Sequence, residues 1–191
     1  MRRIGITGGI GSGKSVVSRL LRIMGYSVYD TDSEAKRLME SSLEVVQKLS
    51  ECFGRDIYHN GRLNRGLLSS RVFGESDKIV LLNSIVHPVV RFDFYRWSES
   101  LNEEICFVES AILYESRFDE LVDEVWTLTA PEELRIGRVR QRSGLTEEEI
   151  KKRMAAQLSE EEKQRRAAHI IWNDGNVSVI HRVLSLLKSL E

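Results

Sequence analysis

The sequence predicts an α/β fold in which helices cover both faces of a parallel sheet. Two observations carry this prediction. Short apolar runs that fit buried strands alternate along the chain with segments of helical periodicity. A glycine-rich loop at residues 8–15 joins the first apolar run to the first helical segment. The expected strands cover residues 2–7, 26–29, 105–108, 124–129 and 169–172.

The helices of the first half follow from apolar spacing and turn signals. Residues 16–24 carry apolar side chains at helical spacing, and Gly25 ends the pattern. The Asn60-Gly61 pair indicates a tight turn. Further helices are expected at residues 33–39, 43–53, 67–73 and 79–86.

A proline marks the start of another helix. Pro88 fits the first turn of a long helix that ends near Leu101, with His87 at its N-terminal cap. Ser76 is expected to cap the preceding helix through its hydroxyl. The pattern therefore predicts two helices that meet at the His87-Pro88 step.

The second half has equally clear helix starts. Pro131 opens one helix, and the T-x-x-E and S-x-x-E sequences that begin at Thr146 and Ser159 fit capping boxes. Residues 177–190 are expected to form a closing helix.

Composition indicates a soluble globular protein. The chain has 191 residues, 41% of them hydrophobic and 30% charged, and its formal net charge is −1. This charge gives no reason to expect broad binding to nucleic acid or to an anionic membrane. Two cysteines are too few for a disulfide framework, and no segment has the length of a transmembrane helix or the pattern of a signal peptide. We expect a cytoplasmic protein that is a monomer or at most a weak oligomer.

The loop at residues 8–15 reads G-G-I-G-S-G-K-S and matches the phosphate-binding pattern G-x-x-x-x-G-K-[ST]. Its glycines allow backbone N–H groups to curl around phosphates, Lys14 suits the β- and γ-phosphates, and the Ser15 hydroxyl suits Mg²⁺. The motif stands between a strand and a helix, as it requires. We therefore expect a three-layer P-loop NTPase fold whose ATP site includes Gly8, Gly9, Ile10, Gly11, Ser12, Gly13, Lys14, Ser15 and Val16.

Polar residues follow several of the expected strands. Asp30 and Asp32 follow the second, Glu109 the third and Asn173 the last. Ligands bind at the carboxyl ends of parallel strands, so these side chains are expected to converge near the loop. A carboxylate there suits the base that takes a proton from a hydroxyl acceptor. Asp32 is the first candidate and Asp30 the second, although either also fits a helix cap.

Glu109 has two interpretations of equal weight. It ends an apolar run, where an acidic residue often lies behind Mg²⁺, but an ordinary solvated loop acid would fit the same position. Arg138 and Arg142 lie four residues apart and share one helix face. Arginines on a mobile segment stabilise the charge of a transferring phosphoryl group, whereas a solvated charged helix face is the plainer alternative.

The chain resembles the dephospho-CoA kinase family over nearly its whole length. The resemblance rests on I-T-G-G-I-G-S-G-K-S, on Y-D-T-D at residues 29–32, on G-R-L-N-R at 61–65 and on L-N-S-I-V-H-P at 82–88. It extends to A-I-L-Y-E at 111–115, R-V-R-Q-R at 138–142, the pair Gln157 and Lys163, and N-D-G at 173–175.

The resemblance implies transfer of the γ-phosphate of ATP to the 3′-hydroxyl of dephospho-CoA, with Mg²⁺. It implies Asp32 as the base, Arg65 as an acceptor ligand, Arg138 and Arg142 as lid arginines and Asn173 beside the adenine. His87 and Glu109 are further candidates for the acceptor site. We expect one domain over residues 1–191, with a helical acceptor-binding region at about 33–101 and a small lid at about 138–165.

Two other functions fit the sequence less well. Another P-loop kinase of nucleotides or sugars would share the loop and the lid arginines, but not the later motifs together. A GTP-dependent switch would carry N-K-x-D and D-x-x-G, and neither occurs in the sequence.

Overall fold

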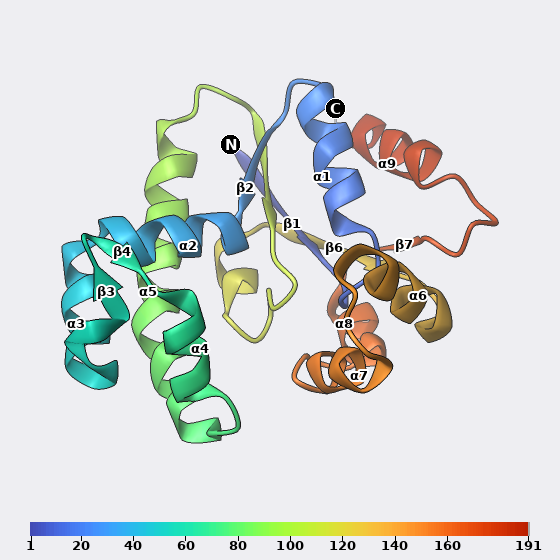
Figure 1. Ribbon diagram of the computed structural model, residues 1–191. Coiled ribbons are helices and arrows are strands. Elements are labelled where there is room, and N and C mark those ends of the chain that lie inside the picture. The colour runs from blue at the N-terminus through green and yellow to red at the C-terminus, as the bar shows by residue number, and fades with distance from the viewer. Residues whose placement is uncertain (191) are drawn as a thin grey trace. The chain divides into compact units, whose positions relative to one another are not determined.

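The computed structural model describes residues 1–190, and it divides into two compact units. The first unit comprises residues 1–30 and the chain from Asn102 on, and the second comprises Thr31–Leu101. Figure 1 shows the sheet with its helices and the mainly helical second unit, and each is described separately below.

The first unit is built on a five-stranded sheet with the order β2-β5-β1-β6-β7. All of its pairings are parallel, which confirms the predicted fold class. The strands are mainly apolar along their buried lengths because helices cover the sheet on both faces. Their bounds are β1 Arg2–Thr7, β2 Ser27–Asp30, β5 Ile105–Glu109, β6 Glu124–Thr129 and β7 His169–Trp172.

Helices α1 (Lys14–Ile23) and α9 (Val179–Lys188) cover one face of this sheet. Their apolar stripes meet the strands in a core that includes Val17, Leu21, Phe107, Trp126 and Val183. The opposite face is covered by η2 (Phe118–Leu121) and α8 (Glu160–Arg166).

Two further helices, α6 (Glu132–Ser143) and α7 (Glu147–Ala155), precede α8. Thr146 caps α7 in a reciprocal capping box with Glu149, as predicted. A small apolar cluster of Ile136, Val139 and Ile150 joins α6 to α7, and Ile10 of the glycine loop packs against it. The loop is therefore attached to this helical segment by apolar contact as well as by polar groups.

The second unit is mainly helical. It comprises α2 (Thr31–Ser41), α3 (Leu43–Phe53), η1 (Arg55–Ile57), the hairpin β3 (Tyr58–His59) and β4 (Arg62–Leu63), α4 (Arg65–Val72) and α5 (Ser76–Ser100). The predicted Asn60-Gly61 turn joins the two short strands, with φ of 50° and 75°. Positive φ at both central residues is what a two-residue hairpin turn requires.

The predicted break at His87-Pro88 is wrong, because one continuous helix, α5, runs through it. A proline removes its own backbone hydrogen bond within a helix, but it need not end the helix when packing holds both halves. Here α5 packs against α2, α3 and α4. His87 is therefore a mid-helix residue and no cap. Ser76 does not cap its helix either, since Glu75 holds that position without a side-chain bond.

Strand β2 ends at Asp30, and α2 begins at the next residue. Asp32 consequently lies in the first turn of α2. The sequence predicted a loop at this point, between the strand and the helix, and the structure has none. An acidic side chain is favourable there because the helix N-terminus carries partial positive charge. Among the described residues, no helix combines the length and the apolar character needed to cross a bilayer.

Candidate active site

At several positions, the loop after β1 has a backbone conformation that favours glycine. Gly8, Gly11 and Gly13 have φ of 142°, 81° and 104°. A Cβ on Gly8 would lie 2.1 Å from the backbone oxygen of Leu128, and one on Gly13 would lie 2.2 Å from Asn173 Nδ2. The glycines therefore set both the backbone path and the close packing of the loop against β6 and β7.

Gly13 is the N-cap residue of α1 and makes no side-chain cap bond, since it has no side chain. Gly13 thus offers the amides of the first helical turn no side-chain cap. An anion such as phosphate is the natural partner for such a helix start. Ser15 and Val16, in that first turn, are exposed.

Lys14 folds back over the loop. Its Nζ donates to the carbonyl oxygens of Gly8 at 2.8 Å and Gly9 at 3.3 Å. The ammonium is thereby held at a fixed point on the concave backbone of the loop. A positive charge held in this way needs little reorganisation when phosphate oxygens arrive.

Asn173, directly after β7, and Arg138, on α6, both contact the loop. Asn173 Nδ2 donates to the Ser12 carbonyl at 2.8 Å. Arg138 donates to the backbone oxygens of Asn173 at 2.9 Å and Gly11 at 3.4 Å. The predicted convergence on the loop is thus present for Asn173, and Arg138 of α6 contacts the loop as well. Arg142, one turn farther along α6, is exposed.

A second set of contacts ties the loop to α8 and to the connection before it, and no role was predicted for these contacts from the sequence. Glu160 Oε1 accepts from Gly9 N at 3.0 Å and from Arg135 Nη1 at 3.1 Å. Gln157 Oε1 accepts from Ile10 N at 3.0 Å. A cavity of about 460 Å³ between α6, α7 and α8 has Arg135, Gln157 and Glu160 in its wall. No motif marks Arg135 or Glu160, because both lie in a stretch rich in charges of either sign.

Lys163 is fully buried on the same helix. Its Nζ donates to the Ala111 carbonyl at 2.7 Å and lies 3.5 Å from Glu115 Oε1. Burial lowers the pKa of this ammonium, and Glu115 opposes the fall. Lys163 thereby fixes α8 against the segment that follows β5.

Asp30 and Glu109 are register partners at the ends of β2 and β5. Burial raises the pKa of the Glu109 carboxyl, the Asp30 carboxylate adds to the rise, and the Lys14 ammonium opposes it. Glu109 is therefore no ordinary solvated loop acid. It is a partly buried carboxyl that senses both the loop lysine and the acid beside it.

This raised pKa makes a stability prediction. Folding stability should fall as the pH rises from the pKa of Glu109 in the unfolded chain through its higher folded value, because the native carboxyl resists ionisation. Glu109→Gln should therefore raise the melting temperature at pH 7, where each kcal/mol of stability is worth about 2–4 °C for a chain of this size. The difference should vanish at acid pH, where both states are protonated. Scanning calorimetry across this range measures it, with exposed Glu104→Gln as control, and a lower melting temperature for Glu109→Gln at pH 7 would refute it.

The remaining predicted residues belong to the second unit. Asp32 lies in the first turn of α2, and Arg65 begins α4 and pairs with Glu40 at 3.1 Å. His87 lies within α5, where burial lowers its pKa and favours the neutral imidazole at pH 7. Their roles at the acceptor site stay predictions.

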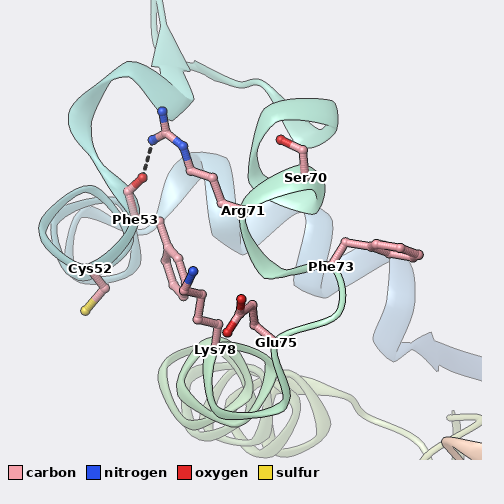
Figure 2. Close-up of a pocket in the computed structure, with 7 residues that line it drawn as sticks. All are labelled: Cys52, Phe53, Ser70, Arg71, Phe73, Glu75 and Lys78. Carbon is pink, nitrogen blue, oxygen red and sulfur yellow. Dashed lines mark hydrogen bonds between the residues drawn. The ribbon is translucent and has the colours of Figure 1, made fainter.

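The second unit also contains a cavity of about 280 Å³, shown in Figure 2. The guanidinium of Arg71 beside it is already bound by the Phe53 carbonyl and by the Asp56 carboxylate. None of the predicted acceptor residues lines this cavity. It therefore adds nothing to the candidate acceptor site.

Among the described residues, no cluster of three or more His, Cys, Asp or Glu side chains could hold a metal ion by itself. Mg²⁺ does not need such a cage, since it is commonly held by one or two protein oxygens together with substrate phosphates. The exposed Ser15 hydroxyl at the start of α1 fits that coordination.

The chain matches known proteins along its whole length. The family model described as dephospho-CoA kinase matches residues 2–178. A dephospho-CoA kinase from Porphyromonas gingivalis is 40% identical over 191 residues, which cover 100% of this chain and 95% of that protein.

Solved structures agree in fold. A crystal structure of a protein from Thermus thermophilus superposes with a TM-score of 0.86 at 36% identity, covering 99% of this chain and 97% of that chain. Dephospho-CoA kinase from Campylobacter jejuni superposes with a TM-score of 0.74 at 23% identity, covering 100% of this chain and 98% of that chain. With the phosphate loop in place and the family model matched from Arg2 to Ser178, this chain belongs to the dephospho-CoA kinase family.

Proposed function

We propose that this protein transfers the γ-phosphate of ATP to the 3′-hydroxyl of dephospho-CoA and so forms coenzyme A, the last step of its biosynthesis. The observation that carries the proposal is the family match over residues 2–178, joined to a phosphate loop whose lysine is already held in place. The family makes the protein a kinase that uses ATP. The roles of individual residues below are our assignments.

On the donor side, the backbone of residues 8–16 binds the phosphates, and Lys14 neutralises charge on the β- and γ-phosphates. Ser15 holds Mg²⁺, which when bound spreads the charge of the phosphate oxygens. Arg138 adds positive charge at the transferring group, and Arg142 binds the nucleotide from the same helix face. Asn173 lies beside the adenine. The contacts of Arg138 and Asn173 with the loop support their place on the donor side.

On the acceptor side, Asp32 takes the proton from the attacking 3′-hydroxyl. Arg65, His87 and Glu109 bind dephospho-CoA. The support for Asp32 is its place in the chain, two residues after β2, a strand of the same parallel sheet as β1, which leads into the phosphate loop. Phosphoryl transfer needs little more of the protein than positioning, charge neutralisation and such a base.

We further propose that residues 33–101 bind the acceptor and that residues 138–165 act as the lid, within one kinase domain. The protein works in the cytoplasm as a monomer or weak oligomer, without a nucleic-acid or membrane partner. The formal net charge of −1 supports the absence of broad binding to polyanions.

A panel of acceptors tests the substrate. With Mg²⁺ and ATP, we expect ADP release with dephospho-CoA and only background release with AMP, CMP, gluconate and shikimate. A coupled assay measures ADP, and ATP binding is confirmed on the same sample. If the protein binds ATP but turns over AMP, CMP or a sugar acid in preference, it is a different P-loop small-molecule kinase.

A further inference from the structure

Glu160 joins three elements of the sheet unit at one carboxylate. Oε1 accepts from the backbone N–H of Gly9 and from Arg135, and Oε2 accepts from the Thr129 hydroxyl at 3.1 Å. Thr129 ends β6, and its hydroxyl in turn accepts from Gln164 Nε2 at 3.0 Å. The carboxylate therefore connects the glycine loop, α6 and α8 to the end of the sheet.

The geometry of the Gly8–Gly9 peptide shows on which side of the loop Glu160 lies relative to Lys14. The carbonyl of Gly8 accepts from Lys14 Nζ, while the N–H of Gly9, in the same peptide group, donates to Glu160. No peptide bond among the described residues is cis. In a trans peptide the C=O and N–H point in opposite directions. Glu160 therefore lies on the side of the loop away from the Lys14 ammonium.

The next peptide repeats this arrangement. The carbonyl of Gly9 accepts from Lys14 Nζ and from Ser12 N, while the N–H of Ile10 donates to Gln157 Oε1. Two successive peptides are thus held from the α8 side with both carbonyls directed to the lysine. A Cβ on Gly9 would lie 2.2 Å from Arg135 Nη1 and 2.3 Å from Glu160 Oε1, so the close approach requires glycine there.

Arg135 fixes the carboxylate in turn. It is 6% exposed, its guanidinium lies 3.1 Å from Glu160, and its backbone packs against Gly11. A buried charge of this kind needs its counter-ion, because removal of one partner leaves the other uncompensated. The pair is therefore held firmly rather than free to exchange with solvent.

We propose that Glu160 is a positioning residue for phosphoryl transfer, which orients the Gly8–Gly9 peptide and through it the Lys14 ammonium. Arg135 holds the Glu160 carboxylate, and Gln157 orients the following peptide in the same way. Because Glu160 lies on the face of the loop opposite to Lys14, it supports phosphate binding and does not compete with it. The inference rests on the proposed role of Lys14 as a phosphate ligand.

Substitution of Glu160 tests this role, because it should change kcat/KM for ATP and leave KM for dephospho-CoA unchanged. Glu160→Ala should lower kcat/KM for ATP about tenfold to a hundredfold, the scale expected when a catalytic group is misplaced. Glu160→Gln keeps an oxygen that can accept from Gly9 N–H and should retain more activity. KM for dephospho-CoA should not change in either variant. Glu161→Ala, the next residue on α8 and exposed, is the matched control and should behave as the wild type.

A double variant of Glu160 and Lys14 distinguishes a positioning role of Glu160 from a general loss of structure. In a Lys14→Met background, Glu160→Ala should weaken ATP binding no more than twofold further, because the lysine through which it acts is gone. Calorimetry of ATP binding without acceptor measures this, so an error in the assigned acceptor leaves the test intact. If Glu160→Ala does not fold, the double variant Arg135→Gln, Glu160→Ala leaves no buried charge unpaired, and the same loss of kcat/KM is expected.

Three results would overturn the proposal. Tighter ATP binding in Glu160→Ala would mean that the carboxylate blocks the site. A kcat/KM for ATP within twofold of the wild type would mean that the contact is idle. If Glu160→Ala weakens ATP binding as much in the Lys14→Met background as in the wild type, Glu160 acts independently of the lysine.

Discussion

Asp32→Asn is expected to lower kcat by about 10²–10⁴-fold, the contribution typical of a general base, with little change in ATP affinity. The amide has nearly the shape of the carboxylate, but it cannot take a proton from the 3′-hydroxyl. The ATP-binding loop lies elsewhere in the chain, so nucleotide affinity should persist. Steady-state kinetics with dephospho-CoA and calorimetry with ATP measure the two quantities.

The structure offers a matched control for this substitution. Asp77 is an acidic residue in the first turn of α5, as Asp32 is in the first turn of α2. Asp77→Asn removes the same favourable interaction with a helix N-terminus, worth about 0.3–1 kcal/mol. It should leave kcat unchanged. If Asp32→Asn is active and Asp30→Asn is not, the base is Asp30, which ends β2.

Lys14→Met is expected to lower kcat by about 10²–10³-fold, the loss found when one preorganised electrostatic group is removed. Lys14 is anchored on two loop carbonyls, so the wild-type charge is in place before ATP arrives. Methionine keeps most of the length of the side chain and removes the charge. We also expect weaker ATP binding, because the lysine contacts phosphates in the ground state too.

Lys188→Met is the control for this second substitution. Lys188 is exposed at the end of α9 and also lies in the sheet unit. Its loss should affect neither kcat nor ATP affinity, as measured by the same assays. If Lys14→Met retains wild-type turnover, the charge that stabilises the transferring phosphoryl group comes from another residue, with Arg138 the first to examine.

The sheet and the donor loop could be predicted from the sequence because their signals are local. Short apolar runs gave the five strands, and the loop pattern needs only its own residues and a strand and helix beside it. The Thr146 capping box and the Asn60-Gly61 turn likewise depend on residues within a few positions. Packing overrides such signals, and Pro88 is the clearest case. A local rule places it at a helix start, whereas contacts with three other helices keep α5 continuous.

The support of the loop from α8 could not be predicted in this way. Three consecutive glutamates, Glu160, Glu161 and Glu162, begin α8, and the sequence does not mark which of them turns inward. Only the fold shows that Glu160 meets Gly9 across 151 positions of the chain. Arg135 is equally hidden, because arginines on a charged helix are most often solvated. The roles of Asp32, Arg65 and His87 stay predictions.

The position of the phosphate in the product tests the central claim most directly. Phosphorus and proton magnetic resonance of the product made from dephospho-CoA, ATP and Mg²⁺ locates the new phosphate monoester on the ribose. We expect it on the 3′-oxygen, in a product identical to coenzyme A, with one ADP released for each phosphate transferred. A phosphate at another position, or ADP release without a phosphorylated acceptor, would contradict the assignment.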